Sequence, residues 1–235
     1  MLIFSRAEMK QAAKNSLQGR WGVVIACFLL AVCIPSLVIG GISGFASVAM
    51  EFAAEAEAYG VYGLISSLDS LFSIAVSILI LGPLSIGYYY FNLRFIRGME
   101  VTATLPYRAF SSGCYGRFLM TYFMMELFIF LWSLLFIIPG IIKSLAYAQT
   151  PYILMDHPEM GWKEALKESQ RMMDGHKGEL FVLGLSFIPW LLLVCVTFGI
   201  AMIYVGPYMQ VTYTNFYRTL KEEQLEVTRV LPNQA

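Results

Sequence analysis

The chain has 235 residues, of which 58% are hydrophobic and 14% are charged, and its formal net charge is zero. In a typical soluble domain about a quarter of the residues are charged, so this composition argues against an ordinary soluble domain, and the neutral balance argues against a nucleic acid partner. The four cysteines and two histidines lack the spacing of a metal site, and we expect no metal and no cofactor.

The positive charges are unevenly distributed along the chain. Fifteen of the sixteen Lys and Arg residues fall in four short polar segments separated by apolar runs: Arg6, Lys10, Lys14 and Arg20; Arg94, Arg97, Arg108 and Arg117; Lys163, Lys167, Arg171 and Lys177; Arg218, Lys221 and Arg229. Short loops rich in Lys and Arg stay on the cytoplasmic side of a membrane. The pattern therefore predicts a multi-pass protein of the bacterial cytoplasmic membrane with both termini inside.

An amphipathic helix is predicted before the first apolar run. At the spacing of one helix face, its apolar stripe holds Met9, Ala12, Ala13, Ser16 and Leu17. The first two runs, 22–43 and 70–93, are long enough for a bilayer core about 30 Å thick, which needs about 20 helical residues. We expect both to span, with residues 44–68 outside and Asp69 near the outer surface.

The third run, 118–138, contains one charged residue, Glu126. An ionisable group inside a membrane helix is costly, so Glu126 is predicted to face the bundle or water. One interpretation is a proton or cation site of a transporter. The other is a hydrogen-bonded carboxyl group that fixes helix packing, and the sequence favours neither.

The fourth run, about 141–155, is the weakest candidate span, since it reaches only about 22 Å at 1.5 Å per residue. A span keeps the basic residues that follow it inside, whereas a re-entrant segment would move them outside, so the charge bias favours a span. Lys143 lies near its start, at the outer surface. There it either pairs with Asp69 or extends to the lipid headgroups.

The last apolar stretch, 180–217, has room for two helices that turn near residues 197–199. The predicted fold is therefore an all-α polytopic transmembrane helical bundle of about six helices, arranged as three hairpins, with two cytoplasmic amphipathic helices. Residues 1–220 are expected to form a single integral membrane domain, and residues 221–235 a polar cytoplasmic tail.

The second and sixth predicted helices share a pattern that indicates internal duplication. In each, a Gly-Pro pair is followed seven residues later by Tyr and twelve residues later by Arg: Gly82-Pro83, Tyr89 and Arg94; Gly206-Pro207, Tyr213 and Arg218. Helix breaks are predicted at Gly82, Pro83, Pro139, Gly140, Gly206 and Pro207. Such breaks either surround a transported substrate or simply kink the helices.

A second amphipathic helix is predicted from about residue 160 to residue 174, with Gly175 as its stop. We expect its apolar face to lie on the membrane surface or over the inner mouth of the bundle. That face holds Trp162, Leu166, Ser169, Met172 and Met173. The polar residues 156–159 just before it are interpreted as a solvated turn.

The C-terminal part of the chain resembles a known family. The residues that carry the resemblance are Leu131-Trp132-Ser133-Leu134-Leu135-Phe136-Ile137-Ile138-Pro139-Gly140-Ile141-Ile142-Lys143, then Glu164-Ala165-Leu166, Gly175-His176-Lys177 and Pro207-Tyr208. They resemble a bacterial membrane-protein family known as domain of unknown function 975. The fourth run is more distantly similar to the membrane portion of glycerophosphodiester phosphodiesterases, whose soluble catalytic domain has no counterpart here. Neither resemblance implies a catalytic residue.

No nucleophile elbow, P-loop or Rossmann motif is present in the sequence, and we predict that the protein is not an enzyme. We expect it to act through membrane lipids, a protein partner or a second copy of itself, in envelope homeostasis or self-protection. The alternative is a small secondary transporter or permease component that uses Glu126. A water-filled cavity at Glu126 would favour the transporter, whereas lipid-facing grooves in a packed bundle would favour the first hypothesis.

Overall fold

The computed structural model describes residues 6–111 and 113–230, and every regular element in these ranges is a helix. Most of these residues belong to three successive groups of helices, which we call the first, second and third hairpins. The first consists of α2 (Trp21–Phe28), η1 (Leu29–Cys33) and α3 (Ile34–Glu55), followed by α4 (Tyr59–Val76), η2 (Ser77–Leu81) and α5 (Gly82–Ile96). The second consists of α7 (Tyr115–Leu135), α8 (Ile137–Tyr147) and α9 (Thr150–Asp156). The third consists of α11 (Lys177–Leu185), α12 (Ile188–Val196) and α13 (Met202–Val230).

Shorter helices connect and cover the hairpins. The N-terminal helix is α1 (Arg6–Leu17), and η3 (Leu105–Tyr107) and α6 (Arg108–Ser111) join the first hairpin to the second. The helix α10 (Trp162–Met172) lies between the second hairpin and the third. The last helix, α13, continues to Val230 and so passes through the predicted domain boundary at residue 220, while residues 231–235 of the predicted tail lie outside the described ranges.

Within the described ranges, four helical stretches are long and apolar enough to cross a membrane: Trp21–Glu55, Tyr59–Ile96, Tyr115–Leu135 and Lys177–Val196. The fourth and sixth predicted spans are helical but do not belong to this set. The fourth is divided into α8 and α9 at residues 148–149. The sixth, in α13, carries Thr212, Thr214 and Asn215, and these polar side chains are fully buried by the surrounding helices. Because neighbouring helices shield it, α13 does not need the apolar composition of a lipid-exposed helix.

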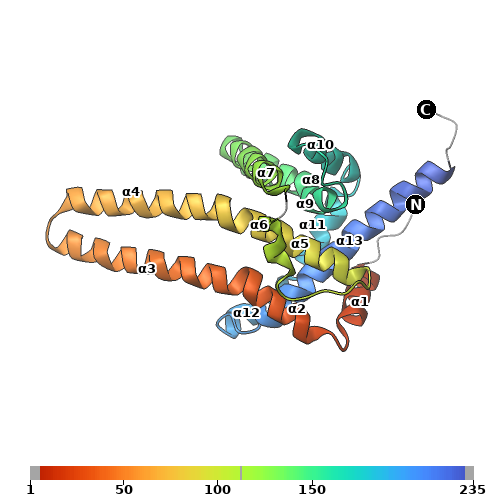
Figure 1. The fold of residues 1–235 in the computed structure, drawn as a ribbon, viewed down its shortest axis with the longest axis horizontal. Coiled ribbons are helices and arrows are strands. Elements are labelled where there is room, and N and C mark those ends of the chain that lie inside the picture. Colours follow the sequence, from red (N-terminus) through yellow and green to blue (C-terminus); the bar gives the residue numbers. More distant parts are fainter. Residues whose placement is uncertain (1–5, 112, 231–235) are drawn as a thin grey trace.

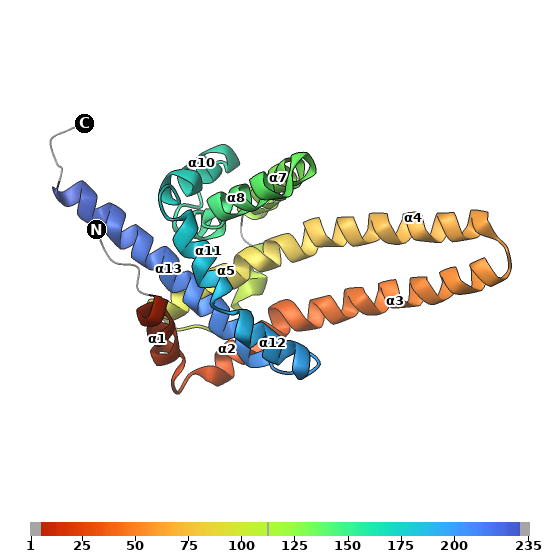
Figure 2. The same cartoon turned by 180° about the vertical axis from the view of Figure 1, so that it is seen from behind.

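Residues 44–68 belong mostly to a long helical pair. The antiparallel helices α3 and α4 extend well beyond the other helices (Figures 1 and 2). Ala53 is the one buried residue of α3, and the described residues of α4 include none. Large apolar side chains such as Leu37, Phe45 and Leu68 are exposed. The pair therefore presents a continuous apolar surface, far larger than soluble monomers usually expose.

The three hairpins pack against one another in a cycle. The helix α5 packs on α7, α8 packs on α11, and α13 packs on α2. Each returning helix thus contacts the outgoing helix of another hairpin. The long helix α13 also packs on α1 and α5, and its Phe216 is fully buried in the same hydrophobic core as Phe91 of α5 and Phe187.

The chain stays helical through both Gly-Pro pairs, so neither pair ends a helix. A π-helical turn, η2, precedes Pro83, and such a turn accommodates the missing N–H and the bulk of a proline ring. Pro207 lies inside α13. The two glycines instead permit close packing: a Cβ at Gly82 would lie 2.6 Å from the Tyr122 ring, and one at Gly206 would lie 2.5 Å from the Phe28 ring.

The break predicted at Pro139-Gly140 lies three residues after the turn that the structure shows. The turn between α7 and α8 lies at Phe136, and both residues belong to the start of α8. A Cβ at Gly140 would lie 2.9 Å from the Cα atom of Ser133. The glycine therefore lets the two helices approach closely directly after a one-residue turn.

Both amphipathic helices bury their apolar faces against the bundle. In α1 the buried residues are Met9, Ala13 and Leu17, and the helix packs on α13. In the α10 region Leu166, Ser169, Met172 and Met173 are buried, while Trp162 is half-buried with its ring centroid 6.1 Å from that of Phe128. The backbone at Gly175 has φ of +82°, in the left-handed region that favours glycine, so the chain turns there as predicted.

Ser169 links α10 to the break between α8 and α9. Its hydroxyl donates a hydrogen bond to the carbonyl of Ala146 at 2.8 Å and accepts one from the N–H of Gln149 at 3.2 Å. Helix ends leave backbone groups without intrahelical partners. One buried hydroxyl therefore satisfies a backbone group on each side of the break.

Residues of the basic segments meet at one end of the bundle. Arg20 donates to the carbonyl of Met99 at 3.4 Å, and Arg117 donates to the carbonyl of Pro158. Arg97 and Lys221 both bind the carboxylate of Asp156. The first, second and fourth basic segments thus lie beside one another, next to the residues that precede the third.

Candidate functional site

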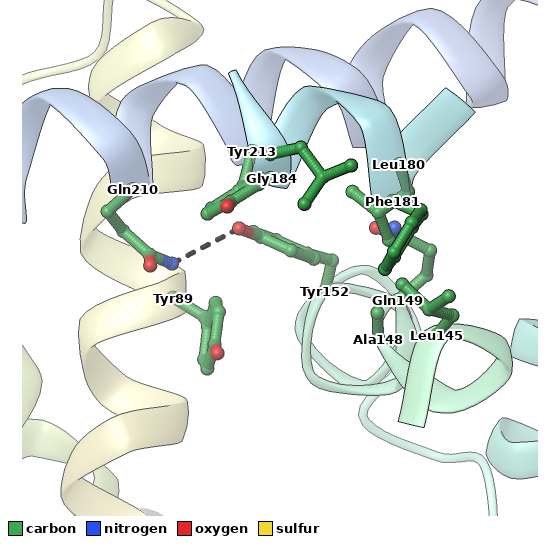
Figure 3. A pocket seen from close by; sticks show the side chains of 11 residues that line it. Tyr89, Leu145, Ala148, Gln149, Tyr152, Leu180, Phe181, Gly184, Gln210 and Tyr213 are labelled. Atoms are coloured by element: carbon green, nitrogen blue, oxygen red, sulfur yellow. Dashed lines mark hydrogen bonds between the residues drawn. The ribbon is translucent and has the colours of Figure 1, made fainter. Parts of the chain in front are cut away.

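A pocket of about 360 Å³, which we call the tyrosine pocket, lies where α5, α8, α9, α11 and α13 meet (Figure 3). Six of the lining residues are apolar or glycine: Leu145, Ala148, Leu180, Phe181, Gly184 and Leu185. The other five are polar: Tyr89, Gln149, Tyr152, Gln210 and Tyr213. None of these lining residues is charged. The composition suits a ligand with an apolar part and an uncharged hydrogen-bonding part.

Tyr152 is held in place by its contacts with other polar residues of the pocket. The Nε2 of Gln210 donates to its hydroxyl at 3.1 Å (Figure 3), and the same hydroxyl lies 3.2 Å from the Oγ1 of Thr214. The ring of Tyr89 meets the Tyr152 ring edge-on, with centroids 4.9 Å apart. Because Tyr152 is 2% exposed, these contacts hold its phenol in one orientation.

Gln149 contributes an unpaired acceptor to the pocket lining. Its side chain belongs to a residue that is 2% exposed, and its Nε2 is 3.4 Å from the Sδ of Met173. Its Oε1 is buried without a hydrogen-bond partner. A buried carbonyl oxygen left unpaired costs about 1–3 kcal/mol.

The repeated sequence pattern converges on this pocket. Tyr89 and Tyr213 each follow a Gly-Pro pair by seven residues, and both line the pocket. Their helices, α5 and α13, pack against each other. The sequence pattern identified these two tyrosines as equivalent, but it contained no signal that they share a cavity with Gln149, Tyr152 and Gln210.

Asp156 is buried next to the residues that line the pocket. The prediction that it belongs to a solvated turn is therefore wrong. Its side chain is 6% exposed. The carboxylate accepts hydrogen bonds from Arg97 and Tyr217, both at 2.9 Å, and from Lys221. The ring of Tyr217 in turn stacks on Tyr152, with centroids 5.0 Å apart. The ion cluster is therefore connected to the pocket through two stacked rings.

The two cations of this cluster are equivalent in the repeat. Arg97 lies fifteen residues after Gly82, and Lys221 lies fifteen residues after Gly206. Burial of the Asp156 carboxyl group raises its pKa, but the hydrogen bonds from Lys221, Arg97 and Tyr217 outweigh burial and hold the pKa below its ordinary value. The folded protein therefore stabilises the ionised form.

The structure does not join Lys143 and Asp69, which were expected to pair or to lie separately at the outer surface. The carboxylate of Asp69 accepts a hydrogen bond from Ser43 at 3.0 Å, across the first hairpin. The ammonium group of Lys143 lies 5.1 Å from the centroid of the Trp132 ring, a cation–π distance. Each charged group thus has a local partner of its own.

Glu126 lies near the middle of α7, and its side chain is exposed on the surface of the protein. The phenol of Tyr122, one turn earlier, is placed to donate a hydrogen bond to its carboxylate. The carboxylate also lies near Tyr89. Glu126 is therefore a neighbour of the tyrosine pocket, although it does not line it.

Comparison with known proteins gives a family. The family model described as Protein of unknown function (DUF975) matches residues 1–143 and 134–224. These ranges include every residue that lines the tyrosine pocket, together with Asp156. Neither the curated proteins nor the solved structures include a significant match to the chain.

We predict that Asp156→Asn lowers stability by about 1–3 kcal/mol, because it removes the charge that Arg97 and Lys221 bind. Thermal unfolding of the purified protein in detergent measures this loss. The control is Asp174→Asn, since Asp174 is 86% exposed and lies 3.8 Å from Lys177, and we expect it to have little effect. An equal loss in both variants would contradict the proposed role of Asp156.

The same cluster predicts a pH dependence. The pKa of Asp156 is lower in the folded chain than its ordinary value of 3.8. Its stabilisation is therefore fully present above about pH 4 and is lost as pH falls through the folded-state pKa. Acidification below that point should lower the unfolding temperature of the native chain more than that of the Asp156→Asn variant. If the two unfolding temperatures fell in parallel with pH, Asp156 would not be the group that titrates.

Proposed function

We propose that this chain, which belongs to the DUF975 family, is an integral protein of the bacterial cytoplasmic membrane that binds a membrane lipid in the tyrosine pocket and is not an enzyme. The observation that carries the proposal is the pocket itself, a cavity lined by apolar residues and by five uncharged hydrogen-bonding side chains. The presence of four helical stretches apolar enough to cross a membrane supports the location.

The apolar lining residues of the pocket support entry from the bilayer. Phe181 and Leu185 at its rim are each 45% exposed. Both belong to the stretch Lys177–Val196, which is long and apolar enough to cross a membrane. An acyl chain that lies against this stretch would therefore reach the pocket without passing through water.

The polar lining residues support a neutral, hydroxyl-bearing lipid such as a diacylglycerol. The pocket offers three phenols and two amides, including the unpaired Oε1 of Gln149. A hydroxyl group supplies the donor that this oxygen lacks. A charged headgroup would lose its water here without meeting an opposite charge, which is costly.

The lining residues also favour binding over catalysis. They are tyrosine, glutamine, glycine and apolar residues, and enzymes that act on lipid esters need a nucleophile with an adjacent base, or a metal-bound water. The phenols of Tyr89, Tyr152 and Tyr213 are suited to hold a hydroxyl group in place. The proposed role is thus that of a lipid-binding membrane protein, and envelope homeostasis is the process that such binding would serve.

We predict that Gly184→Leu blocks the pocket. Gly184 lines it, and a Cβ at this position would lie 3.6 Å from the Tyr213 hydroxyl, so the backbone tolerates a side chain that then fills the cavity. Photo-crosslinking with a photoactivatable diacylglycerol should fall about tenfold, as expected for a binding loss of ~1.4 kcal/mol. Gly178→Leu is the control, since it lies in the same helix with open space around it. Equal labelling of both variants would refute the pocket as a lipid site.

The contacts among basic segments support an orientation with both termini and the α10 helix inside, as the charge bias predicts. In a version without native cysteines, we expect Lys167→Cys to react with an impermeant thiol reagent only after the cells are permeabilised. Ala56→Cys, at the tip of the α3–α4 hairpin, should react in intact cells. Both residues are exposed in the structure. Reaction of Lys167→Cys in intact cells would overturn this orientation.

A second candidate function is a small secondary transporter that uses Glu126. Its support is the position of Glu126 beside Tyr122 and Tyr89, at the edge of the tyrosine pocket. Glu126→Gln keeps the size and hydrogen bonding of the side chain but cannot ionise. In liposomes with an internal pH dye and an imposed potential, the lipid-binding proposal predicts equal proton flux for the native chain and this variant. A flux that the variant loses would favour the transporter.

A further inference from the structure

A second pocket, of about 310 Å³, shares no lining residue with the tyrosine pocket. We call it the arginine pocket. Its apolar lining includes Leu105, Ala109, Phe118 and Leu154, and Tyr90 and Arg108 also line it. These residues come from α5, η3, α6, α7 and α9. The pocket therefore lies beside the segment that joins the first hairpin to the second, near the end where the basic segments meet.

The wall of this pocket is closely packed. A Cβ at Gly87 would lie 2.2 Å from the carbonyl oxygen of Pro106, so α5 and η3 are in contact through the glycine. The Tyr107 hydroxyl donates to the carbonyl of Leu30 at 2.7 Å, which ties the same segment to the first hairpin. Arg108 follows directly and is therefore held at the pocket by its backbone.

One arginine lines the pocket, and two more contact residues that line it. Arg108 lines it. Arg94 donates to the Tyr90 hydroxyl at 3.3 Å and lies 5.6 Å from that ring's centroid. Arg117 donates to the carbonyl of Pro158, another lining residue. The pocket thus combines an apolar interior with a cationic rim.

The described residues leave these three cations without a carboxylate. None of them belongs to an ion pair. Two acidic residues that flank the lining residue Pro158 in the sequence are engaged: Asp156 binds Arg97 and Lys221, and Glu159 faces His157 at 3.3 Å. The Nε of Arg94 is moreover buried without a hydrogen-bond partner. An oxyanion bound in the pocket would neutralise the charge of Arg108, the arginine that lines it.

We propose that the arginine pocket binds the phosphate group of an anionic phospholipid. Arg108 and Arg94 would hold the phosphate oxygens, because guanidinium groups match phosphate geometry through paired N–H donors. The first part of an acyl chain would occupy the apolar interior around Leu105, Phe118 and Leu154. The site is distinct from the tyrosine pocket in position and in charge, so it does not depend on the function proposed for that pocket.

The test is a titration of the full-length protein in a neutral detergent with three probes: short-chain phosphatidylglycerol, phosphatidylcholine of the same chain length, and inorganic phosphate. The thermal unfolding midpoint reports binding. We expect phosphatidylglycerol to raise it at concentrations about tenfold lower than the other two, as the charge-assisted contacts require. Inorganic phosphate as effective as phosphatidylglycerol would overturn the lipid assignment, and so would an equal response to phosphatidylcholine.

Variants locate the site. Arg108→Gln and Arg94→Gln should each weaken the response to phosphatidylglycerol about tenfold. Arg218→Gln is the matched control, because Arg218 is the repeat equivalent of Arg94 but lies 3.5 Å from Glu222. An equal loss in Arg218→Gln, or no loss in Arg108→Gln, would overturn the proposal. Arg108 is exposed, so its variant decides the outcome even where Arg94→Gln fails to fold. Gly184→Leu should leave this response unchanged, which separates the two pockets.

Discussion

The arrangement of the bundle depends on one buried carboxylate. Asp156 ends α9, Arg97 directly follows α5, and Tyr217 and Lys221 lie within α13. Burying a charge is unfavourable unless its partners compensate for the lost water, so this cluster is stable only when these three segments are correctly placed. Its stacked neighbours, Tyr217 and Tyr152, then extend that constraint to the polar residues of the tyrosine pocket. Helix packing and pocket geometry thus depend on the same ion cluster.

Hydrophobic periodicity and turn residues predicted much of the fold. The apolar faces of α1 and α10 follow from their spacing, and the turns at Gly175 and at residues 197–199 follow from glycine chemistry. The family expected from the C-terminal residues is confirmed, and its match extends over nearly the whole chain. The Gly-Pro pairs do not end their helices: a π-helical turn precedes Pro83, and both glycines permit close tertiary packing.

The tyrosine pocket could not be predicted from the sequence, for a different reason. Its polar residues come from α5, α9, α13 and the segment between α8 and α9, and no short motif joins them. Asp156 lies in a polar run that suggests solvent, and only the tertiary structure brings Arg97 and Lys221 to it. One signal was present. Counted from the glycine of each Gly-Pro pair, Arg97 and Lys221 both lie at the fifteenth residue. Two cations at equivalent positions suggest an anion that binds both.

The first hairpin is longer than the hydrocarbon layer of a membrane is thick. The stretch Trp21–Glu55 has 35 residues, or about 52 Å at 1.5 Å per residue. Containing it within about 30 Å of hydrocarbon would need a tilt of about 55°, beyond the ~40° that membrane helices reach. In a bilayer the tip, with Glu51, Glu55 and Glu57, therefore stands outside the hydrocarbon. Hydrophobic mismatch then makes bilayer thickness determine how much of the exposed apolar surface around Phe45 and Phe52 lipid covers.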